Sequence, residues 1–123
     1  MASKIRQKVL VVDDEREIVD FLCNFLQRFG ISVAKAKNAQ EVFEKHKKDK
    51  PDYIFLDIGM PECDGLEVLK QLKKNNSKAK VIMITAKTDK NSLATAKKYG
   101  AIDYITKPLD LGELSKKIED YIL

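Results

Sequence analysis

The fold is decided by residues 53–65, which read YIFLDIGMPECDG. The first four residues form an apolar run with the length and composition of a buried strand. Asp57 ends this run, and a loop rich in glycine and proline follows. Open α/β sheets bind ligands in the crevice outside the carboxyl ends of their strands. A carboxylate at this point is therefore placed for chemistry rather than for packing.

Strand-like apolar runs recur along the whole chain. They are Val9–Val12, Ile31–Ala34, Tyr53–Leu56, Val81–Thr85 and Ala101–Ile105. Between them, apolar residues follow the i, i+3, i+4, i+7 spacing of helices, most clearly from residue 18 to residue 29. Strict alternation of strand and helix with short connections predicts an α/β fold, in which helices cover both faces of a parallel five-stranded sheet. This arrangement is a doubly wound (βα)5 three-layer sandwich.

Four of the five predicted helices begin with a polar residue followed three positions later by glutamate, the spacing of a capping box. The pairs are Asp14 with Glu17, Asn38 with Glu41, Asp64 with Glu67, and Asp110 with Glu113. Gly30 and Gly100 are the expected helix stops. The fourth helix lacks such a pair and has fewer large apolar residues. We therefore expect it to be held least firmly.

Length and charge limit the classes of function. A chain of 123 residues suits one domain, 1–123, with 1–7 as a polar N-terminal lead. No apolar run approaches membrane-spanning length, so we expect a cytoplasmic protein with no membrane partner. The net charge of +4 comes from lysines scattered over every predicted helix. Direct nucleic-acid binding is not expected, because it normally needs a clustered basic patch.

Polar residues follow four of the five strands. They are Asp13 and Asp14 after the first strand, Asp57 after the third, Thr85 at the end of the fourth and Lys107 after the fifth. All strands of a parallel sheet end at the same edge, so these side chains should converge if the strands are neighbours. Packed carboxylates repel one another unless some are protonated or a cation joins them. Hard oxygen ligands favour Mg²⁺.

Carboxylate, divalent metal, hydroxyl and ammonium together make a phosphoryl-transfer site, in which an aspartate can act as the nucleophile. Each residue alone has an ordinary alternative. Asp14 could be a helix cap, Thr85 an ordinary strand residue and Lys107 a surface lysine. Only their joint placement at the strand ends favours function.

With these residues, the chain resembles the receiver domain of two-component response regulators, which has the fold of the chemotaxis regulator. The resemblance covers essentially the whole chain. It rests on VVDDE ending at Glu15, DIGMPECDG beginning at Asp57, ITA around Thr85 and DYITKP ending at Pro108. It implies a flavodoxin-like fold with sheet order 2-1-3-4-5.

The resemblance also assigns roles around the carboxylates. Asp57 would be the phosphoacceptor. Asp14 and Asp57 would bind Mg²⁺ directly, Asp13 would act through water, and the backbone carbonyl of Gly59 would be a further ligand. Lys107 would pair with a phosphoryl oxygen.

Other roles implied by the resemblance concern the surroundings of the phosphoryl group. Thr85 would hydrogen-bond a second phosphoryl oxygen, and Tyr104 would turn inward when Thr85 moves. The bond before Pro108 would be cis, which is essentially confined to proline. Ala86 would also lie near the phosphate. So would Gly59 and Lys87, whose positions tend to set the dephosphorylation rate in this family.

The implied function is a phosphorylation-activated switch that accepts its phosphoryl group from a sensor histidine kinase or a histidine phosphotransfer protein. It would be an autocatalytic phosphoacceptor with slow self-dephosphorylation, not an enzyme acting on an external substrate. The face formed by the fourth helix, the fifth strand and the last helix would bind an effector protein, and a phosphorylation-dependent homodimer is a further expectation.

The alternative is a metal-dependent phosphatase or phosphotransferase with an aspartate nucleophile. Such enzymes usually carry an acid/base aspartate two residues after the nucleophile, where this chain has Gly59. The sequence names neither the kinase nor the output target.

Overall fold

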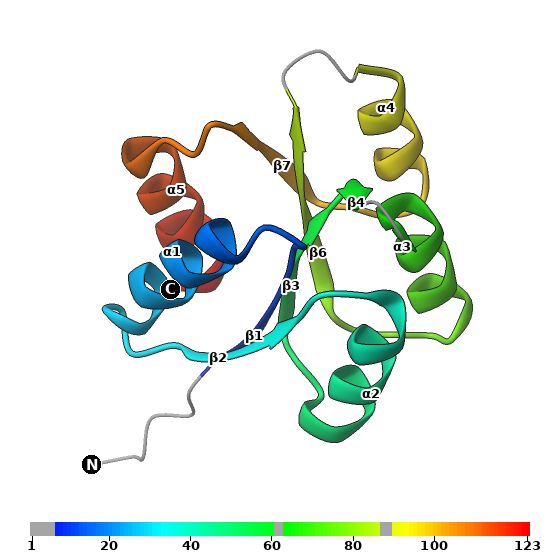
Figure 1. Cartoon of the computed structure of the whole chain (residues 1–123), viewed down its shortest axis with the longest axis horizontal. Coiled ribbons are helices and arrows are strands. Elements are labelled where there is room, and N and C mark those ends of the chain that lie inside the picture. The colour runs from blue at the N-terminus through cyan, green and yellow to red at the C-terminus, as the bar shows by residue number, and fades with distance from the viewer. Residues whose placement is uncertain (1–6, 61–62, 87–89) are drawn as a thin grey trace.

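The computed structural model describes residues 7–60, 63–86 and 90–123 and contains one parallel five-stranded sheet flanked by helices (Figure 1). The sheet order is β2-β1-β3-β6-β7. Its strands are β1 (Lys8–Val12), β2 (Ser32–Ala36), β3 (Tyr53–Asp57), β6 (Lys80–Ala86) and β7 (Asp103–Lys107). Since β6 and β7 are the fourth and fifth strands of this sheet, the predicted order 2-1-3-4-5 is confirmed. A short antiparallel pair, β4 (Gly59–Met60) and β5 (Cys63–Asp64), was not predicted.

Two helix layers cover the sheet. The helices are α1 (Arg16–Gln27), α2 (Ala39–Asp49), α3 (Gly65–Lys74), α4 (Lys90–Lys98) and α5 (Leu111–Lys117), which continues as the π-helical turn η1 (Ile118–Ile122). Helices α1 and α5 lie on one face of the sheet, and α2, α3 and α4 lie on the other (Figure 1). Alternate strand residues enter the two cores: Phe55 packs with the α1 and α5 side, Leu56 with the opposite side. Because both faces are buried, the strands read as continuous apolar runs.

Glycine ends two helices as expected. Gly30 and Gly100 have φ values of +78° and +95°, and each donates its N–H to a carbonyl of the preceding turn. The residue after each glycine also donates to the helix end: Ala101 bonds the carbonyl of Ala96. The predicted strands starting at Ile31 and Ala101 therefore begin one and two residues later, because these first residues complete the helix termini.

Three predicted caps are present and one is wrong. Asn38, Asp64 and Asp110 each accept a backbone N–H from the first turn of their helix. Helix α1 has Glu15 at its N-cap with no side-chain capping bond, so Asp14 is not the cap. The Asp13 carboxylate instead accepts the N–H of Glu15 at 2.9 Å. The turn after β1 thus directs the side chain of Asp13, and not that of Asp14, toward the N-terminus of α1.

Helix α4 buries only Ala96 fully within its described span. Because α2 likewise buries only Val42 and α5 only Leu114, burial does not set α4 apart, and its expected weaker hold stays a prediction. In the described part of the chain, no helix combines the length and apolar character needed to span a membrane.

Candidate functional site

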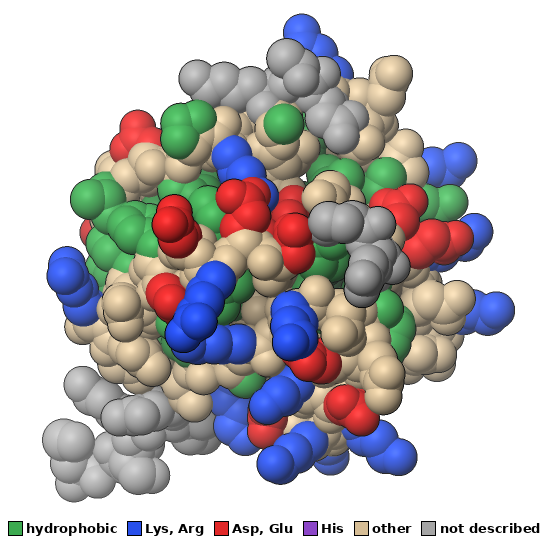
Figure 2. All heavy atoms as spheres, viewed as in Figure 1, with side chains coloured by type: hydrophobic (Ala, Val, Ile, Leu, Met, Phe, Trp, Pro, Cys, Tyr) green, Lys and Arg blue, Asp and Glu red, His purple; other side chains and the backbone are tan. Residues whose placement is uncertain are grey.

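Three carboxylates meet where β1 and β3 end. One oxygen from each of Asp13, Asp14 and Asp57 lies within 4.8 Å of the others. The Asp13 and Asp57 side chains are almost fully buried, whereas Asp14 is exposed. Acidic side chains gather near the middle of the face in Figure 2, with basic side chains both beside them and further out. The predicted convergence of the three acids is confirmed.

The register of the sheet brings Lys107 to this cluster from β7. Its Nζ lies 3.3 Å from Asp57 Oδ2, 3.3 Å from Asp13 Oδ2 and 2.7 Å from Glu15 Oε1. Burial lowers the pKa of Lys107, but the hydrogen bond to Glu15 and the charges of Asp57 and Asp13 raise it more, so the net pKa is above its usual range. The ammonium therefore stays charged. The Lys107–Pro108 peptide bond is cis, as the resemblance implies.

Asp57 is held from both sides. Its Oδ1 accepts the N–H of Gly59 at 3.1 Å, and its Oδ2 faces the Lys107 ammonium. Gly59 belongs to the β4–β5 pair, which folds back so that Gly65 donates its N–H to the carbonyl of Ile58. The turn-rich loop thus fixes the direction of the Asp57 carboxylate.

Asp13 carries an unsatisfied oxygen. Its Oδ2 is buried without a hydrogen-bond partner in the described residues, because the nearby Lys107 ammonium is within ion-pair distance but outside hydrogen-bond geometry. Burial raises the pKa of Asp13 to about 7; the Glu15 N–H and Lys107 lower it, and the charge of Asp57 raises it. A buried carboxylate with a free oxygen, next to two further carboxylates, is a donor set that fits a hard divalent cation such as Mg²⁺. The residues present therefore fit the metal that the family implies.

The two predicted switch residues lie on β6 and β7, the strands that follow β3 in the sheet. Thr85 is buried, and its hydroxyl donates to the carbonyl of Ala86 at 3.2 Å. Tyr104 is 44% exposed, and its ring lies 5.9 Å from the Lys117 ammonium. A cavity of about 250 Å³ between α4 and the sheet has Tyr104 and Met83 in its wall. The Tyr104 ring is therefore partly exposed to solvent and borders this cavity, into which an inward turn would carry it.

Two predicted phosphate neighbours can be placed. Ala86 is exposed and pairs with Lys107 across the β6–β7 ladder, and Gly59 is exposed next to Asp57. A Cβ at Gly59 would meet no heavy atom within 4 Å. Lys87 lies outside the described residues, as do residues 1–6 of the predicted N-terminal lead.

Sequence reasoning missed Glu15 as a partner of Lys107. The sequence places Glu15 only as the last residue of the acidic VVDDE motif. The one available signal was a third acid directly after Asp13 and Asp14, at a strand end where a lysine was also expected. Nothing in the sequence separates this acid from an ordinary first-turn glutamate.

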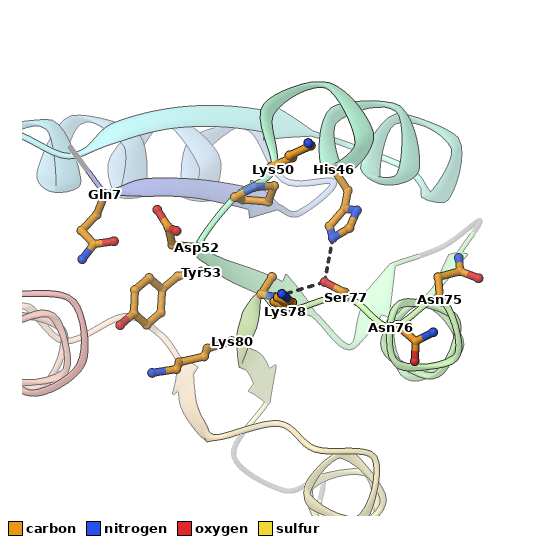
Figure 3. Close-up of a pocket in the computed structure, with 12 residues that line it drawn as sticks. Gln7, His46, Lys50, Asp52, Tyr53, Asn75, Asn76, Ser77, Lys78 and Lys80 are labelled. Carbon is orange, nitrogen blue, oxygen red and sulfur yellow. Dashed lines mark hydrogen bonds between the residues drawn. The ribbon is translucent and has the colours of Figure 1, made fainter. Parts of the chain in front are cut away.

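A further cavity lies at the other end of the sheet. It measures about 550 Å³ and is bordered by the starts of β3 and β6, with Lys50, Lys78 and Lys80 in its wall (Figure 3). Lys50 and Lys80 extend in opposite directions in this view, so the basic groups do not converge on one point. His46 and Ser77 meet at 2.6 Å and tie α2 to the segment before β6, and burial lowers the pKa of His46. The contact between His46 and Ser77 thus holds two parts of the fold together, and the candidate site remains the cluster of Asp13, Asp14 and Asp57 at the opposite edge of the sheet.

Comparison with known proteins agrees with this geometry. The family model of the response regulator receiver domain matches residues 9–119. The alkaline phosphatase synthesis transcriptional regulatory protein PhoP of Bacillus subtilis is 37% identical over 115 residues, which cover 94% of this chain and 48% of that protein. Sporulation initiation phosphotransferase F of Bacillus subtilis is 29% identical over 118 residues, which cover 96% and 95%. The chain thus spans about half of the first relative and nearly all of the second.

Solved structures show the same fold. A two-component response regulator from Clostridium difficile superimposes with a TM-score of 0.87 and 30% identity, covering 94% of each chain. A CheY-like receiver domain protein from Methanospirillum hungatei gives a TM-score of 0.87 and 28% identity, covering 94% of this chain and 93% of that one. The chain belongs to the response regulator receiver domain family of two-component signalling.

Proposed function

We propose that this chain works as one receiver domain in which Asp57 accepts a phosphoryl group, and that phosphorylation switches its partner surface. The observation that carries the proposal is the environment of Asp57. Its buried carboxylate lies between a charged lysine and two further aspartates, at the carboxyl edge of a parallel sheet. A buried side chain with charged neighbours of both signs is typical of a reactive group.

The donor would be a phosphohistidine on a sensor kinase or a phosphotransfer protein. An Asp57 oxygen forms the new bond to phosphorus while the phosphorus–nitrogen bond breaks. The electron pair returns to the imidazole, which takes up a proton. The N–H of Gly59 holds the other oxygen, so that the attacking oxygen is presented in a fixed direction. The product is an aspartyl phosphate, whose hydrolysis needs only water.

Asp14 and Asp57, with the backbone carbonyl of Gly59, would hold Mg²⁺ directly, and Asp13 would hold it through water. When bound, Mg²⁺ offsets the charge of the phosphoryl oxygens. The ammonium of Lys107 pairs with one of these oxygens, which it can reach because it already lies 3.3 Å from Asp57 Oδ2. Lys107 and the hydroxyl of Thr85 thus hold the transferred group.

The signal would leave the site through Thr85 and Tyr104. To bond the phosphoryl group, the Thr85 hydroxyl must give up the carbonyl of Ala86, and the space it leaves lets Tyr104 turn inward. A phosphoryl group adds about −1.5 to −2 charges, and a few charge-assisted hydrogen bonds can supply the roughly 5.5 kcal/mol that a nearly complete switch needs.

The partner surface would be formed by α4, β7 and α5. Exposed apolar side chains lie on or beside these elements, namely Ile102 before β7, Tyr104 on β7, Leu111 on α5 and Tyr121 on η1. An effector, or a second phosphorylated copy of this chain, would bind there. The relatives include a transcriptional regulatory protein and a phosphotransferase, so both an attached effector and a separate phosphotransfer partner have precedent. The cytoplasmic location expected from the sequence stays a prediction.

The test is incubation with Mg²⁺ and a small phosphodonor such as phosphoramidate, followed by intact mass measurement. The proposal expects one phosphoryl adduct on the wild type, little without Mg²⁺ and none on Asp57→Asn. An adduct of equal yield on Asp57→Asn would overturn it. Multiple turnovers of a phosphomonoester would instead favour the phosphatase alternative.

A further inference from the structure

The closest partner of Lys107 is not an aspartate of the site. Its Nζ lies 2.7 Å from Glu15 Oε1, compared with 3.3 Å from Asp57 and 3.3 Å from Asp13. An ammonium group has three N–H donors, and here three carboxylates surround it. Glu15 therefore takes the shortest of the contacts that Lys107 makes with carboxylates.

Glu15 makes this contact from an unusual position. It is the N-cap residue of α1, where a side-chain oxygen normally accepts a free N–H of the first turn. No such bond is present, and the Glu15 carboxylate contacts Lys107, 92 positions further along the chain. The Glu15 side chain is thus directed to the carboxylate site and not to the first turn of its own helix.

The three carboxylates differ in how readily they can release the ammonium. Asp13 and Asp57 have side chains that are 0% and 3% exposed, whereas that of Glu15 is 57% exposed. Leaving a buried carboxylate unpaired is costly, but an exposed one is rehydrated at once. Glu15 is therefore the partner that Lys107 can leave when a phosphoryl oxygen arrives.

We propose that Glu15 is a positioning residue that holds Lys107 back and so slows phosphorylation of Asp57. The inference rests on the proposed function and names a residue that regulates it. Before transfer, the Glu15 carboxylate competes with the incoming phosphoryl group for the same ammonium. Removing that competitor leaves Lys107 free to meet the phosphoryl oxygens. Because the pair is partly exposed, the expected gain is modest, about two- to fivefold in rate.

The test compares phosphorylation rates of the wild type, Glu15→Gln and Glu17→Gln at saturating Mg²⁺ with a small phosphodonor. Glu17 is the matched control, because it is an exposed acid in the first turn of the same helix and makes no ion pair with any described residue. We expect Glu15→Gln to react about two- to fivefold faster and Glu17→Gln to match the wild type. Equal acceleration of both variants would indicate a general charge effect and overturn the inference.

Two further measurements separate a role through Lys107 from a structural one. Adding Glu15→Gln to Lys107→Met should give no acceleration, since the residue that Glu15 restrains is gone; acceleration in that background would contradict the inference. Without donor or metal, the ¹⁵N signal of the Lys107 ammonium should move in Glu15→Gln but not in Glu17→Gln. An adduct that forms at equal rates on all variants overturns this inference alone, whereas no adduct on the wild type overturns the proposed function as well.

Discussion

The backbone of Gly65 lies so close to that of Asp57 that no side chain fits between them. A Cβ at position 65 would overlap the backbone oxygen of Asp57 and lie 2.8 Å from the Cα of Ile58. The atoms that this Cβ would meet are backbone atoms of Asp57 and Ile58, which cannot move aside as a flexible side chain can. The glycine that begins α3 is therefore part of what fixes the end of β3, where the proposed phosphoacceptor Asp57 lies.

Gly65→Ala should destabilise the protein by about 1 to 3 kcal/mol, the usual cost of forcing extra atoms into a packed site. Urea unfolding measures this loss. Gly59→Ala is the matched control, because a Cβ there meets no heavy atom within 4 Å, and it should change stability by less than about 0.5 kcal/mol. Equal stability of the two variants would contradict the close packing around Asp57.

Mg²⁺ affinity should fall as the pH is lowered through 7. The pKa of Asp13 is raised to about 7, so below that pH the metal must displace a proton from it. We expect the apparent affinity to fall by up to about tenfold per pH unit below 7. Calorimetric titration between pH 5.5 and 8.5 measures it. Asp13→Asn should bind more weakly at pH 8 and lose most of the pH dependence; an unchanged profile would remove Asp13 from the metal site.

The same shift makes a prediction for the metal-free protein. Between the ordinary aspartate pKa of 3.8 and about 7, folded Asp13 holds a proton that the unfolded chain has lost. The folded state then binds more protons, so this group makes the free energy of unfolding decrease as the pH rises through that range. Asp13→Asn should flatten this part of the profile in urea unfolding experiments without metal. A profile equally steep in the variant would contradict a raised pKa at Asp13.

The lifetime of the aspartyl phosphate should depend on residue 59. Gly59 offers no side chain to shield the phosphoryl bond from water, and the space around it is open. Gly59→Met should slow self-dephosphorylation by up to about tenfold, equivalent to about 1.4 kcal/mol of barrier. The decay of the phosphorylated form after donor removal measures this. Unchanged decay in a variant that phosphorylates normally would mean that the shielding comes from elsewhere.

Phosphorylation should loosen or reorganise residues 86–105. This stretch contains α4, which has one buried residue, and the exposed Tyr104. Hydrogen exchange with and without a beryllofluoride phosphoryl mimic measures the change. Altered protection in 86–105 is expected, with the edge strand β2 (Ser32–Ala36), which carries no residue of the site, as the unaffected reference. Identical protection in 86–105 would contradict signalling through this face.

The apolar runs predicted a parallel sheet whose strand ends share one edge, and the family resemblance supplied the strand order that brings Asp13, Asp57 and Lys107 together. The sequence could not predict side-chain partners set by three-dimensional distance. The lack of a cap at Asp14 and the contact between Glu15 and Lys107 depend on how the chain turns out of β1. The short β4–β5 pair, which holds Gly59 against Asp57, is two residues on each side and leaves no periodic pattern.

The central claim is that Asp57 itself carries the phosphoryl group. Borohydride reduces an acyl phosphate to an alcohol, so treatment of the phosphorylated protein should convert the acceptor aspartate to homoserine, which peptide mass spectrometry locates. The account predicts homoserine at position 57 only after incubation with donor and Mg²⁺. Conversion of another acid, such as Asp13 or Asp14, with Asp57 intact would contradict it.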